Sequence, residues 1–363
     1  MTAPEPREGI MELRPYKGGD AVLEGFAEPI RLASNEGALG PSPLAVAALE
    51  RLGPELHRYP DGGATAMRQA LAEHHGLEAE RIVCGTGSDE LLSQICRAYA
   101  GPGDEVVYSE HGFMWYKMTA RSCGATPVAA PEVDLTANVD NLLAAVGAKT
   151  RVVFLANPNN PTGTAISRHE IERLHAGLPE DVLLVLDGAY AEYIEDDWYS
   201  DGAELVEAAQ NVVMTRTFSK LHSLAHIRLG WAYCPTAVAD VLDRIRAPFN
   251  VAGPAIAAGL AALADREHAV RTRAHTIQWR DWLAAEASKL GLGTTSSVAN
   301  FVLLRFPDTA GRTAHDADTF LRQRGIIVRT QDPVGLSDCL RISIGNEDEM
   351  RTTLAALSEF MQD

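Results

Sequence analysis

Residues Asn211–Lys220 read NVVMTRTFSK and join a strand-like run to a lysine. The first half is apolar and rich in β-branched residues, which is typical of a strand buried inside a sheet. A lysine at the end of such a strand, in a closed site, is desolvated and loses its proton readily, as imine formation with an aldehyde cofactor requires. Because most lysines are solvated, this interpretation of Lys220 depends on the segments that accompany it.

Short apolar runs alternate with helical patterns from about residue 65 to residue 250. Besides the run before Lys220, they are Arg81–Cys84, Glu105–Tyr108, Arg151–Ala156, Val182–Asp187 and Leu229–Tyr233. This alternation predicts an α/β fold with a mostly parallel sheet buried between helices. A polar or glycine-bearing segment follows each run, so we expect side chains with chemistry to gather at one edge of the sheet.

The C-terminal part has a different pattern, which predicts a separate, smaller α+β unit. A long alanine-rich helical stretch from Pro254 to about Leu290 precedes three strand-like runs. These runs are Asn300–Phe306, Gly325–Arg329 and Cys339–Ile344. We therefore divide the chain into an N-terminal arm (1–30), a large domain (31–250) and a small C-terminal domain (251–363) that includes part of the N-terminal segment.

The composition excludes several classes of protein. Thirty-two basic and 49 acidic residues among 363 give a net charge of −17, which repels nucleic acid and anionic lipid surfaces. The five cysteines form no C-x-x-C pair and are odd in number, which argues against a disulfide framework or a zinc ribbon. No stretch reaches the ~18 apolar residues of a membrane span, and the first residues lack a signal-peptide pattern. We expect a cytoplasmic protein without nucleic-acid or membrane partners.

Three further segments at predicted strand ends carry chemistry. Gly85–Glu90 (GTGSDE) opens a helix, so its backbone N–H groups can cradle a phosphate, although a glycine turn there is often only structural. Asp187 ends an apolar run and is suited to pair with a pyridinium nitrogen, or otherwise to cap a helix. Asn157–Gly163 (NPNNPTG) forms a turn that can aim amide side chains inward.

The order of these segments resembles that of fold type I aminotransferases, which use pyridoxal 5′-phosphate (PLP), and within them of the class II histidinol-phosphate aminotransferase family. The series is a phosphate cradle, an aromatic segment, the Asn-Pro turn, Asp187 with a tyrosine three residues later, Ser-Lys, and an arginine eight residues after the lysine. Further matches are Leu13–Tyr16, Ser34–Glu36, Gly40–Pro43, Arg58–Pro60 and Leu340–Gly345. The resemblance covers nearly the whole chain. It implies a homodimer whose subunits have a large PLP domain and a small C-terminal domain.

The resemblance also implies roles for single residues around the cofactor. Lys220 would hold PLP as a Schiff base and shuttle the proton, while Asp187 would pair with the pyridine nitrogen. Asn160 and Tyr190 would bind the phenolic oxygen. Contacts to the phosphate are expected from Gly87, Ser88, Asp89, Ser219 and Arg228, and from Tyr59 of the other subunit.

On the substrate side, the resemblance implies that Arg341 binds an anionic group in a bidentate manner, as lysine cannot. In this family the group is the phosphate of histidinol phosphate, and Arg329 assists. Tyr16, from the neighbouring arm, and Asn35 are the other expected substrate contacts. Phe113 matches the aromatic residue that stacks on the cofactor ring, with Tyr116 or Trp115 as alternative registers, since stacking tolerates such changes.

The function implied is ping-pong transfer of the amino group of histidinol phosphate to 2-oxoglutarate, giving glutamate, in histidine biosynthesis. Three alternatives remain: an aminotransferase for aromatic or many amino acids, a PLP-dependent decarboxylase of a phosphorylated amino acid, and a non-catalytic PLP-binding relative. The complete set of Lys220, Asp187, Asn160, Tyr190 and Arg228 argues against the last.

The segment after Lys220 departs from the family pattern. His222-Ser223 stands where an aromatic residue and glycine are usual, and His226 stands where a small residue is usual. Gly188 replaces the usual Glu or Ala, and Ala38 the usual Pro. The two histidines lack the glutamate of an H-E-x-x-H site and an evident third ligand, so we expect no metal.

Overall fold

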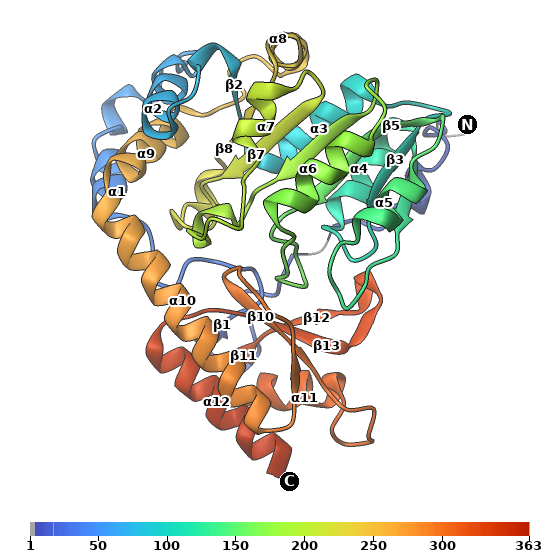
Figure 1. The fold of residues 1–363 in the computed structure, drawn as a ribbon. Coiled ribbons are helices and arrows are strands. Elements are labelled where there is room, and N and C mark those ends of the chain that lie inside the picture. Colours follow the sequence, from blue (N-terminus) through green and yellow to red (C-terminus); the bar gives the residue numbers. More distant parts are fainter. Residues whose placement is uncertain (1–3, 17, 363) are drawn as a thin grey trace.

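The computed structural model describes residues 4–16 and 18–362, so the predicted arm's residues 1–3 and 17 lie outside the described part, as does residue 363. Within that part, the largest sheet has the strand order β2-β8-β7-β6-β5-β3-β4 (Figure 1). Its strands are β2 (Ile82–Gly85), β3 (Glu105–Ser109), β4 (Thr126–Ala130), β5 (Thr150–Ala156), β6 (Leu183–Asp187), β7 (Val212–Thr217) and β8 (Gly230–Tyr233). Neighbouring strands are parallel except at β8, which is antiparallel to both β2 and β7. The predicted mostly parallel sheet is confirmed.

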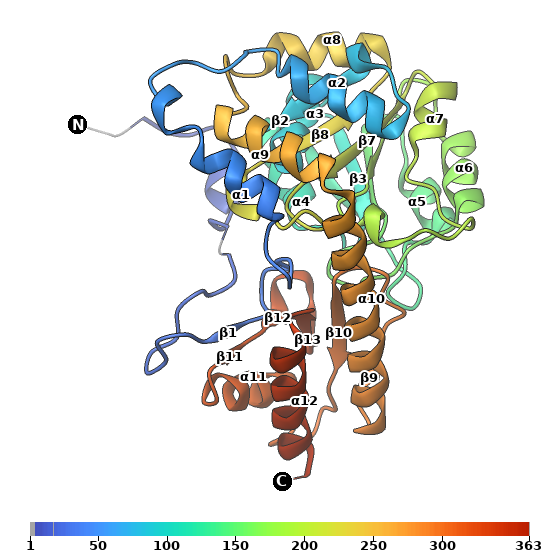
Figure 2. The same cartoon turned by 90° about the vertical axis from the view of Figure 1, so that its left-hand side faces the viewer.

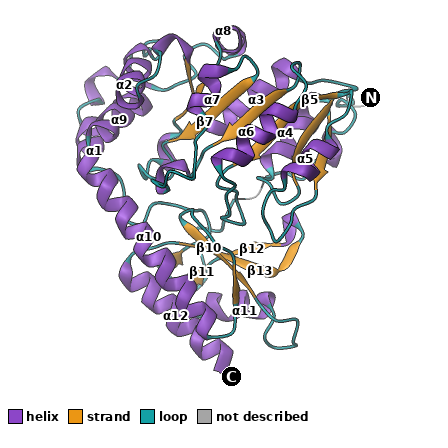
Figure 3. Ribbon diagram, in the orientation of Figure 1, coloured by secondary structure: helices purple, strands orange, loops and turns teal. Residues whose placement is uncertain are grey.

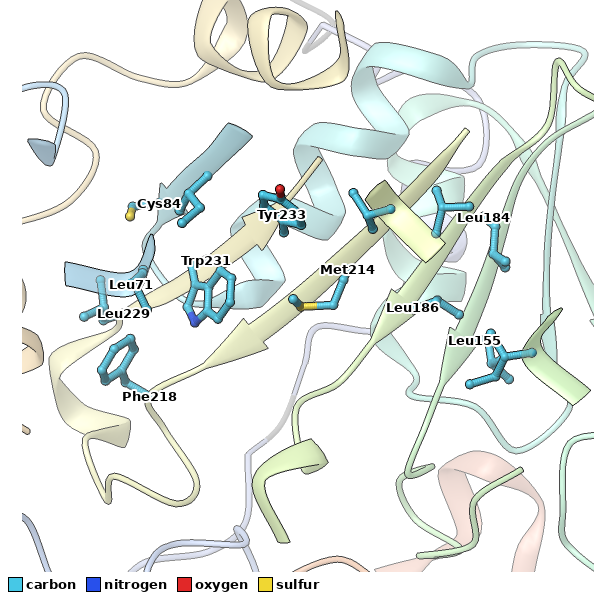
Figure 4. Close-up of a cluster of buried hydrophobic side chains, with 14 of the residues drawn as sticks. Leu71, Cys84, Leu155, Leu184, Leu186, Met214, Phe218, Leu229, Trp231 and Tyr233 are labelled. Atoms are coloured by element: carbon cyan, nitrogen blue, oxygen red, sulfur yellow. The ribbon is translucent and has the colours of Figure 1, made fainter. Parts of the chain in front are cut away.

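Helices cover both faces of this sheet (Figure 3) because both faces are apolar. Along β6, Leu184 and Leu186 belong to one buried cluster and Leu183 and Val185 to the other, as the two-residue period of a strand requires. The first cluster, shown in Figure 4, packs against α1 (Pro43–Glu50), α2 (Thr65–His75), α5 (Val139–Ala145), α6 (Arg168–Gly177), α7 (Ala203–Ala208) and α9 (Gly253–Ala264). The second packs against α3 (Ser88–Tyr99), α4 (Trp115–Cys123) and α8 (Thr236–Ile245).

A smaller unit lies beyond the edge of the large sheet where its parallel strands end (Figures 1 and 2). Its sheet has the order β12 (Arg329–Gln331), β13 (Leu336–Ser343), β10 (Phe301–Arg305) and β9 (Gly293–Thr294), and all of these pairs are antiparallel. The short strand β1 (Ile30–Arg31) pairs in parallel with β11 (Ile326–Ile327). The helices α10 (Arg266–Lys289), α11 (Ala314–Arg322) and α12 (Glu347–Gln362) complete the unit.

The structure changes two sequence-based element predictions. The helical stretch from Pro254 to Leu290 is two helices, because the chain leaves helical geometry at Asp265, whose carboxylate accepts the backbone N–H of His268 and caps α10. The run Gly325–Arg329 is divided between β11 and β12. Neither break was predicted from the sequence.

The packing also bears on the predicted division into domains. Leu32, next to β1, packs in the small unit's core with Ile342, whereas Ala258 of α9 packs in the core of the large sheet. The bounds of the arm, the large domain and the small domain therefore remain a proposal. In the described part of the chain, no helix is long and apolar enough to cross a membrane.

Candidate active site

A cavity of about 580 Å³ lies where the large sheet meets the small unit. Its lining includes residues that follow β2, β3, β5, β6 and β7, all of which run in the same direction and end at one edge of the sheet. The predicted site residues in this lining are Tyr16, Asn35, Ser88, Asp89, Phe113, Asn160, Asp187, Tyr190, Ser219, Lys220, Arg228, Arg329 and Arg341. The fold thus brings together side chains that are more than 300 residues apart.

Lys220 follows β7 and its amine lies inside the cavity. The Nζ atom is 3.3 Å from the carbonyl oxygen of Ser34 and 3.2 Å from that of Asn35, and it lies 5.9 Å from the ring centre of Tyr190. Burial, and after it the positive charge of Arg341, lowers the pKa of Lys220 to about 8. At pH 7 a pKa of about 8 leaves roughly a tenth of this amine neutral, far more than for an ordinary lysine.

The start of α3 and Arg228 lie at one end of the cavity and could bind an anion there. Nη2 of Arg228 donates to Oδ1 of Asp89 at 2.7 Å, and Nη1 donates to Oγ of Ser219 at 3.3 Å. Gly87 precedes the helix at φ 86°, where a Cβ would lie 2.3 Å from Nη2 of Arg228. Glycine at this position leaves the N-terminal N–H groups of α3 open to an anion.

Asp187 is the last residue of β6 and is 4% exposed. Its Oδ2 accepts the hydroxyl of Tyr116 at 2.7 Å, and its Oδ1 accepts the hydroxyl of Thr215 at 3.2 Å. Burial raises the pKa of Asp187, while these two hydrogen bonds act in the opposite direction. The site therefore contains a buried carboxylate with its own set of donors.

Tyr190 and Asn35 are joined in a buried network. Nδ2 of Asn35 donates to the hydroxyl oxygen of Tyr190 at 2.9 Å, which leaves the phenolic proton of Tyr190 available to another acceptor. Ser343 fixes Asn35, because its hydroxyl accepts the Asn35 backbone N–H at 2.8 Å and donates to Oδ1 at 3.1 Å. The small sheet thus holds a group of the site through Asn35.

Arg341 is a buried arginine without a carboxylate partner among the residues described. It is 8% exposed, and its two Nη atoms donate to Asn160 Oδ1 and, at 2.7 Å, to the carbonyl oxygen of Ala33. Its Nε has no hydrogen-bond partner. Arg329 lies directly opposite on β12, and burial together with this second cation lowers the pKa of Arg341 to about 10. Like charges opposite each other on a strand pair destabilise each other, and an anion bound beside Arg341 would reduce this repulsion.

The aromatic residues of the cavity differ in how tightly their side chains are packed. Tyr116 is fully buried and stacks on Phe154, with ring centres 4.7 Å apart, while Phe113 meets it edge-on. The Tyr116 ring therefore packs in the core, and its hydroxyl binds Asp187. Of the three residues predicted as candidates for stacking on the cofactor ring, Tyr116 is the least suited. Tyr16 is 52% exposed and contacts Trp115 edge-on at 6.5 Å.

Two predicted cofactor contacts, Gly87 and Tyr59, do not line the cavity itself. Gly87 lies beside the Arg228 guanidinium, since a Cβ built on it would lie 2.3 Å from Nη2 of Arg228. Tyr59 is 82% exposed and stacks on Phe249, with ring centres 4.6 Å apart. Its expected role concerns the cavity of a second subunit, which a single chain does not contain.

The departures beside Lys220 lie mostly away from the cavity. His222 stacks on Phe218 and lines a different hollow, beside α2 and α10, and His226 is exposed. A Cβ on Gly188 would lie 3.2 Å from the carbonyl oxygen of Thr215 and from Cβ of Ala191, so the backbone is tight there. No group of three or more His, Cys, Asp or Glu side chains in the described part of the chain could hold a metal ion.

The donor set of the cavity fits a phosphorylated pyridine aldehyde such as PLP. Arg228 supplies a cation for a phosphate, Ser219 a hydroxyl, and the start of α3 backbone N–H donors, with the room that Gly87 leaves. Asp187 supplies a buried acceptor for a ring N–H, and Lys220 supplies an amine with a lowered pKa. These groups come from three separate strand ends.

Comparisons with known proteins agree with this geometry. The family model described as aminotransferase class I and II matches residues 27–357. The histidinol-phosphate aminotransferase of Paramagnetospirillum magneticum is 58% identical over 361 residues, which cover 99% of both chains. That of Maricaulis maris is 53% identical over 358 residues, again 99% of each chain.

Solved structures show the same fold. The crystal structure of histidinol-phosphate aminotransferase from Sinorhizobium meliloti in complex with pyridoxal-5′-phosphate matches with a TM-score of 0.91, 30% identity and coverage of 99% of both chains. An aspartate aminotransferase from Thermus thermophilus matches with a TM-score of 0.84 at 20% identity, over 99% of this chain and 100% of that one. At that identity the second likeness concerns the fold alone.

Proposed function

The chain belongs to the class I and II aminotransferase family, and we propose that it transfers the amino group of histidinol phosphate to 2-oxoglutarate, with PLP as cofactor. The relatives of 49–58% identity that carry this activity in their names support the choice of donor. The observation that carries it in the structure is Arg341, a buried arginine with an unpaired Nε that faces Arg329 across a strand pair.

The two arginines suit the phosphate of the donor. A phosphate monoester carries up to two negative charges and three acceptor oxygens, so it can pair with Arg341, including its Nε, and reach Arg329 as well. 2-Oxoglutarate, the second substrate, is also an anion and can use the same arginines through a carboxylate. Asn35 and Tyr16 are the other residues proposed on this side, and both line the cavity.

The cofactor would be held by residues of the large sheet. Arg228, Ser219 and the Gly87-Ser88-Asp89 turn would bind its phosphate, Asp187 its ring nitrogen, Asn160 and Tyr190 its phenolic oxygen, and Phe113 the face of its ring. When bound, PLP supplies an aldehyde that accepts the amino group and a ring that stabilises negative charge at the neighbouring carbon.

The residues of the chain supply binding and one movable proton. Nζ of Lys220, in the neutral form that its lowered pKa makes more accessible, accepts the proton from the donor carbon that bears the amino group. The ammonium that results remains within reach of the carbonyl oxygens of Ser34 and Asn35, which stabilise it. Arg341 and Arg329 orient the donor so that this carbon lies beside Lys220.

The proposal includes a homodimer in the cytoplasm. The exposed, stacked pair of Tyr59 and Phe249 supports an interface, since aromatic side chains are enriched where subunits meet. In the dimer Tyr59 would reach the cofactor phosphate of the other subunit. The free cysteines, of which Cys84, Cys96, Cys234 and Cys339 are buried, suit a reducing compartment.

The donor is tested by comparing kcat/KM for histidinol phosphate and for phenylalanine, with 2-oxoglutarate as acceptor. We expect histidinol phosphate to be preferred at least about 100-fold, because a phosphate with up to two negative charges suits the two arginines better than the single carboxylate of phenylalanine does. A preference for phenylalanine would contradict the proposed donor and favour an aromatic aminotransferase.

A further inference from the structure

Three donors surround the carboxylate of Asp187. Besides the hydroxyls of Tyr116 and Thr215, at 2.7 and 3.2 Å, the backbone N–H of Ala189 is within hydrogen-bonding range. An ionised carboxylate can accept about four hydrogen bonds. The three donors of the chain therefore leave capacity for one more, and Asp187 lines the cavity where a ring N–H would bind.

Both hydroxyl donors are held rigidly. Tyr116 is 1% exposed, and its ring stacks on Phe154 with an interplanar angle of 7°. Thr215 is fully buried on β7, where it is the register partner of Asp187 on β6. Neither side chain has room to turn away, so the carboxylate can take few orientations.

The electrostatic surroundings of Asp187 oppose its ionisation. Burial raises the pKa of this carboxyl group, and the negative charge of Asp89 at the start of α3 acts in the same direction. The hydroxyls of Tyr116 and Thr215 and the N–H of Ala189 lower it. A neutral Asp187 could not pair as an anion with a protonated ring nitrogen, which is the pairing that makes the ring an electron sink.

We infer that Tyr116 and Thr215 are positioning residues, which keep Asp187 ionised and oriented toward the cofactor ring without touching the substrate. This inference rests on the proposed function, in which Asp187 binds the ring nitrogen. Tyr116 acts from α4 and Thr215 from β7, so two separate elements determine the state of one carboxylate.

The test uses holoenzyme variants that remove one hydroxyl at a time. Tyr116→Phe is expected to lower kcat about 10- to 100-fold with the donor KM changed less than about threefold, since it deletes a buried hydrogen bond to a charged group. The pH below which kcat falls should rise, because the pKa of Asp187 rises when a donor is lost. Thr215→Val should act in the same direction with a smaller effect, and Thr215→Ser should restore wild-type values.

Tyr233→Phe is the matched control. Tyr233 is also buried and donates to a carboxylate, that of Glu207, but it lies on β8 and outside the cavity. We expect it to leave kcat and the pH profile unchanged. If Tyr116→Phe changes kcat no more than Tyr233→Phe does, or if its pH profile stays in place, the inference is overturned.

Asp187→Asn separates this inference from the proposed function. If Asp187→Asn is nearly inactive while Tyr116→Phe is unaffected, only the positioning role fails. If Asp187→Asn retains wild-type transamination, the proposed role of Asp187 itself fails, and the positioning role fails with it.

Discussion

Arg228 and Arg341 line the same cavity, yet their surroundings are opposite. Arg228 has a 43% exposed side chain and is paired with Asp89. Arg341 is 8% exposed, has no carboxylate partner in the described part of the chain and faces Arg329. The first arginine is neutralised before any ligand binds, whereas the second is a buried charge that an incoming anion would stabilise.

This difference supports the proposal that the two ends of the cavity bind different ligands. A paired and partly solvated arginine is suited to hold a resident cofactor phosphate, since it needs little rearrangement on binding. A buried and unpaired arginine gains more from an anion and loses more without it, so it discriminates between substrates. In the proposed function the large sheet would provide the cofactor end, and β12 and β13 the substrate end.

The largest effect is expected at Lys220, where the two ends meet. Lys220→Ala should lower kcat by at least about 1,000-fold, because it removes the proposed base, while PLP and the donor still bind. Steady-state assays give kcat, and equilibrium dialysis gives the affinity for PLP. A variant that retained most of its turnover would exclude Lys220 as the base.

Arg341→Gln should lower kcat/KM for histidinol phosphate about 100-fold, since it removes a buried charge that pairs with an anion. Arg341→Lys should lose at least about tenfold, because lysine cannot form the bidentate pair. PLP affinity should stay unchanged in both.

Arg228→Gln is the matched arginine variant for this comparison. Here PLP affinity should fall, while kcat/KM at saturating PLP changes little. If Arg228→Gln and Arg341→Gln affected PLP and donor equally, the division of the cavity into two ends would be wrong.

A smaller effect concerns pH. The pKa of Lys220 is lowered to about 8, chiefly by burial, so the neutral amine increases about tenfold per pH unit up to that value and then levels off. The rate at which the apoenzyme attaches PLP, followed by visible absorbance, should show the same dependence. In Arg341→Gln the midpoint should move to higher pH, because a neighbouring cation is lost. A wild-type rate that continued to rise well above pH 8 would contradict a lowered pKa.

The sequence predicted the cofactor end better than the substrate end. Lys220 and Asp187 lie at the ends of β7 and β6, and parallel strands place such residues together without further information. Arg341 and Arg329 were expected from the resemblance. Their position directly opposite each other depends on the register of β12 and β13 and on the break after β11. A hydrophobic pattern fixes neither.

The roles of Tyr116 and His222 also required the structure. Tyr116 could be counted among several aromatic residues, yet only packing against Phe154 directs its hydroxyl to Asp187. His222, a departure directly after Lys220, lies outside the cavity because it stacks on Phe218. Side-chain direction in a turn depends on tertiary contacts that the local sequence does not specify.

The most direct test of the account is kcat/KM for histidinol phosphate against histidinol, which differ only in the phosphate. If Arg341 and Arg329 bind that phosphate, the wild-type enzyme should prefer histidinol phosphate at least about 100-fold, corresponding to the loss of a charged, hydrogen-bonded pair. Equal values for the two donors would show that the arginine pair does not recognise phosphate, and the account of the substrate end would be wrong.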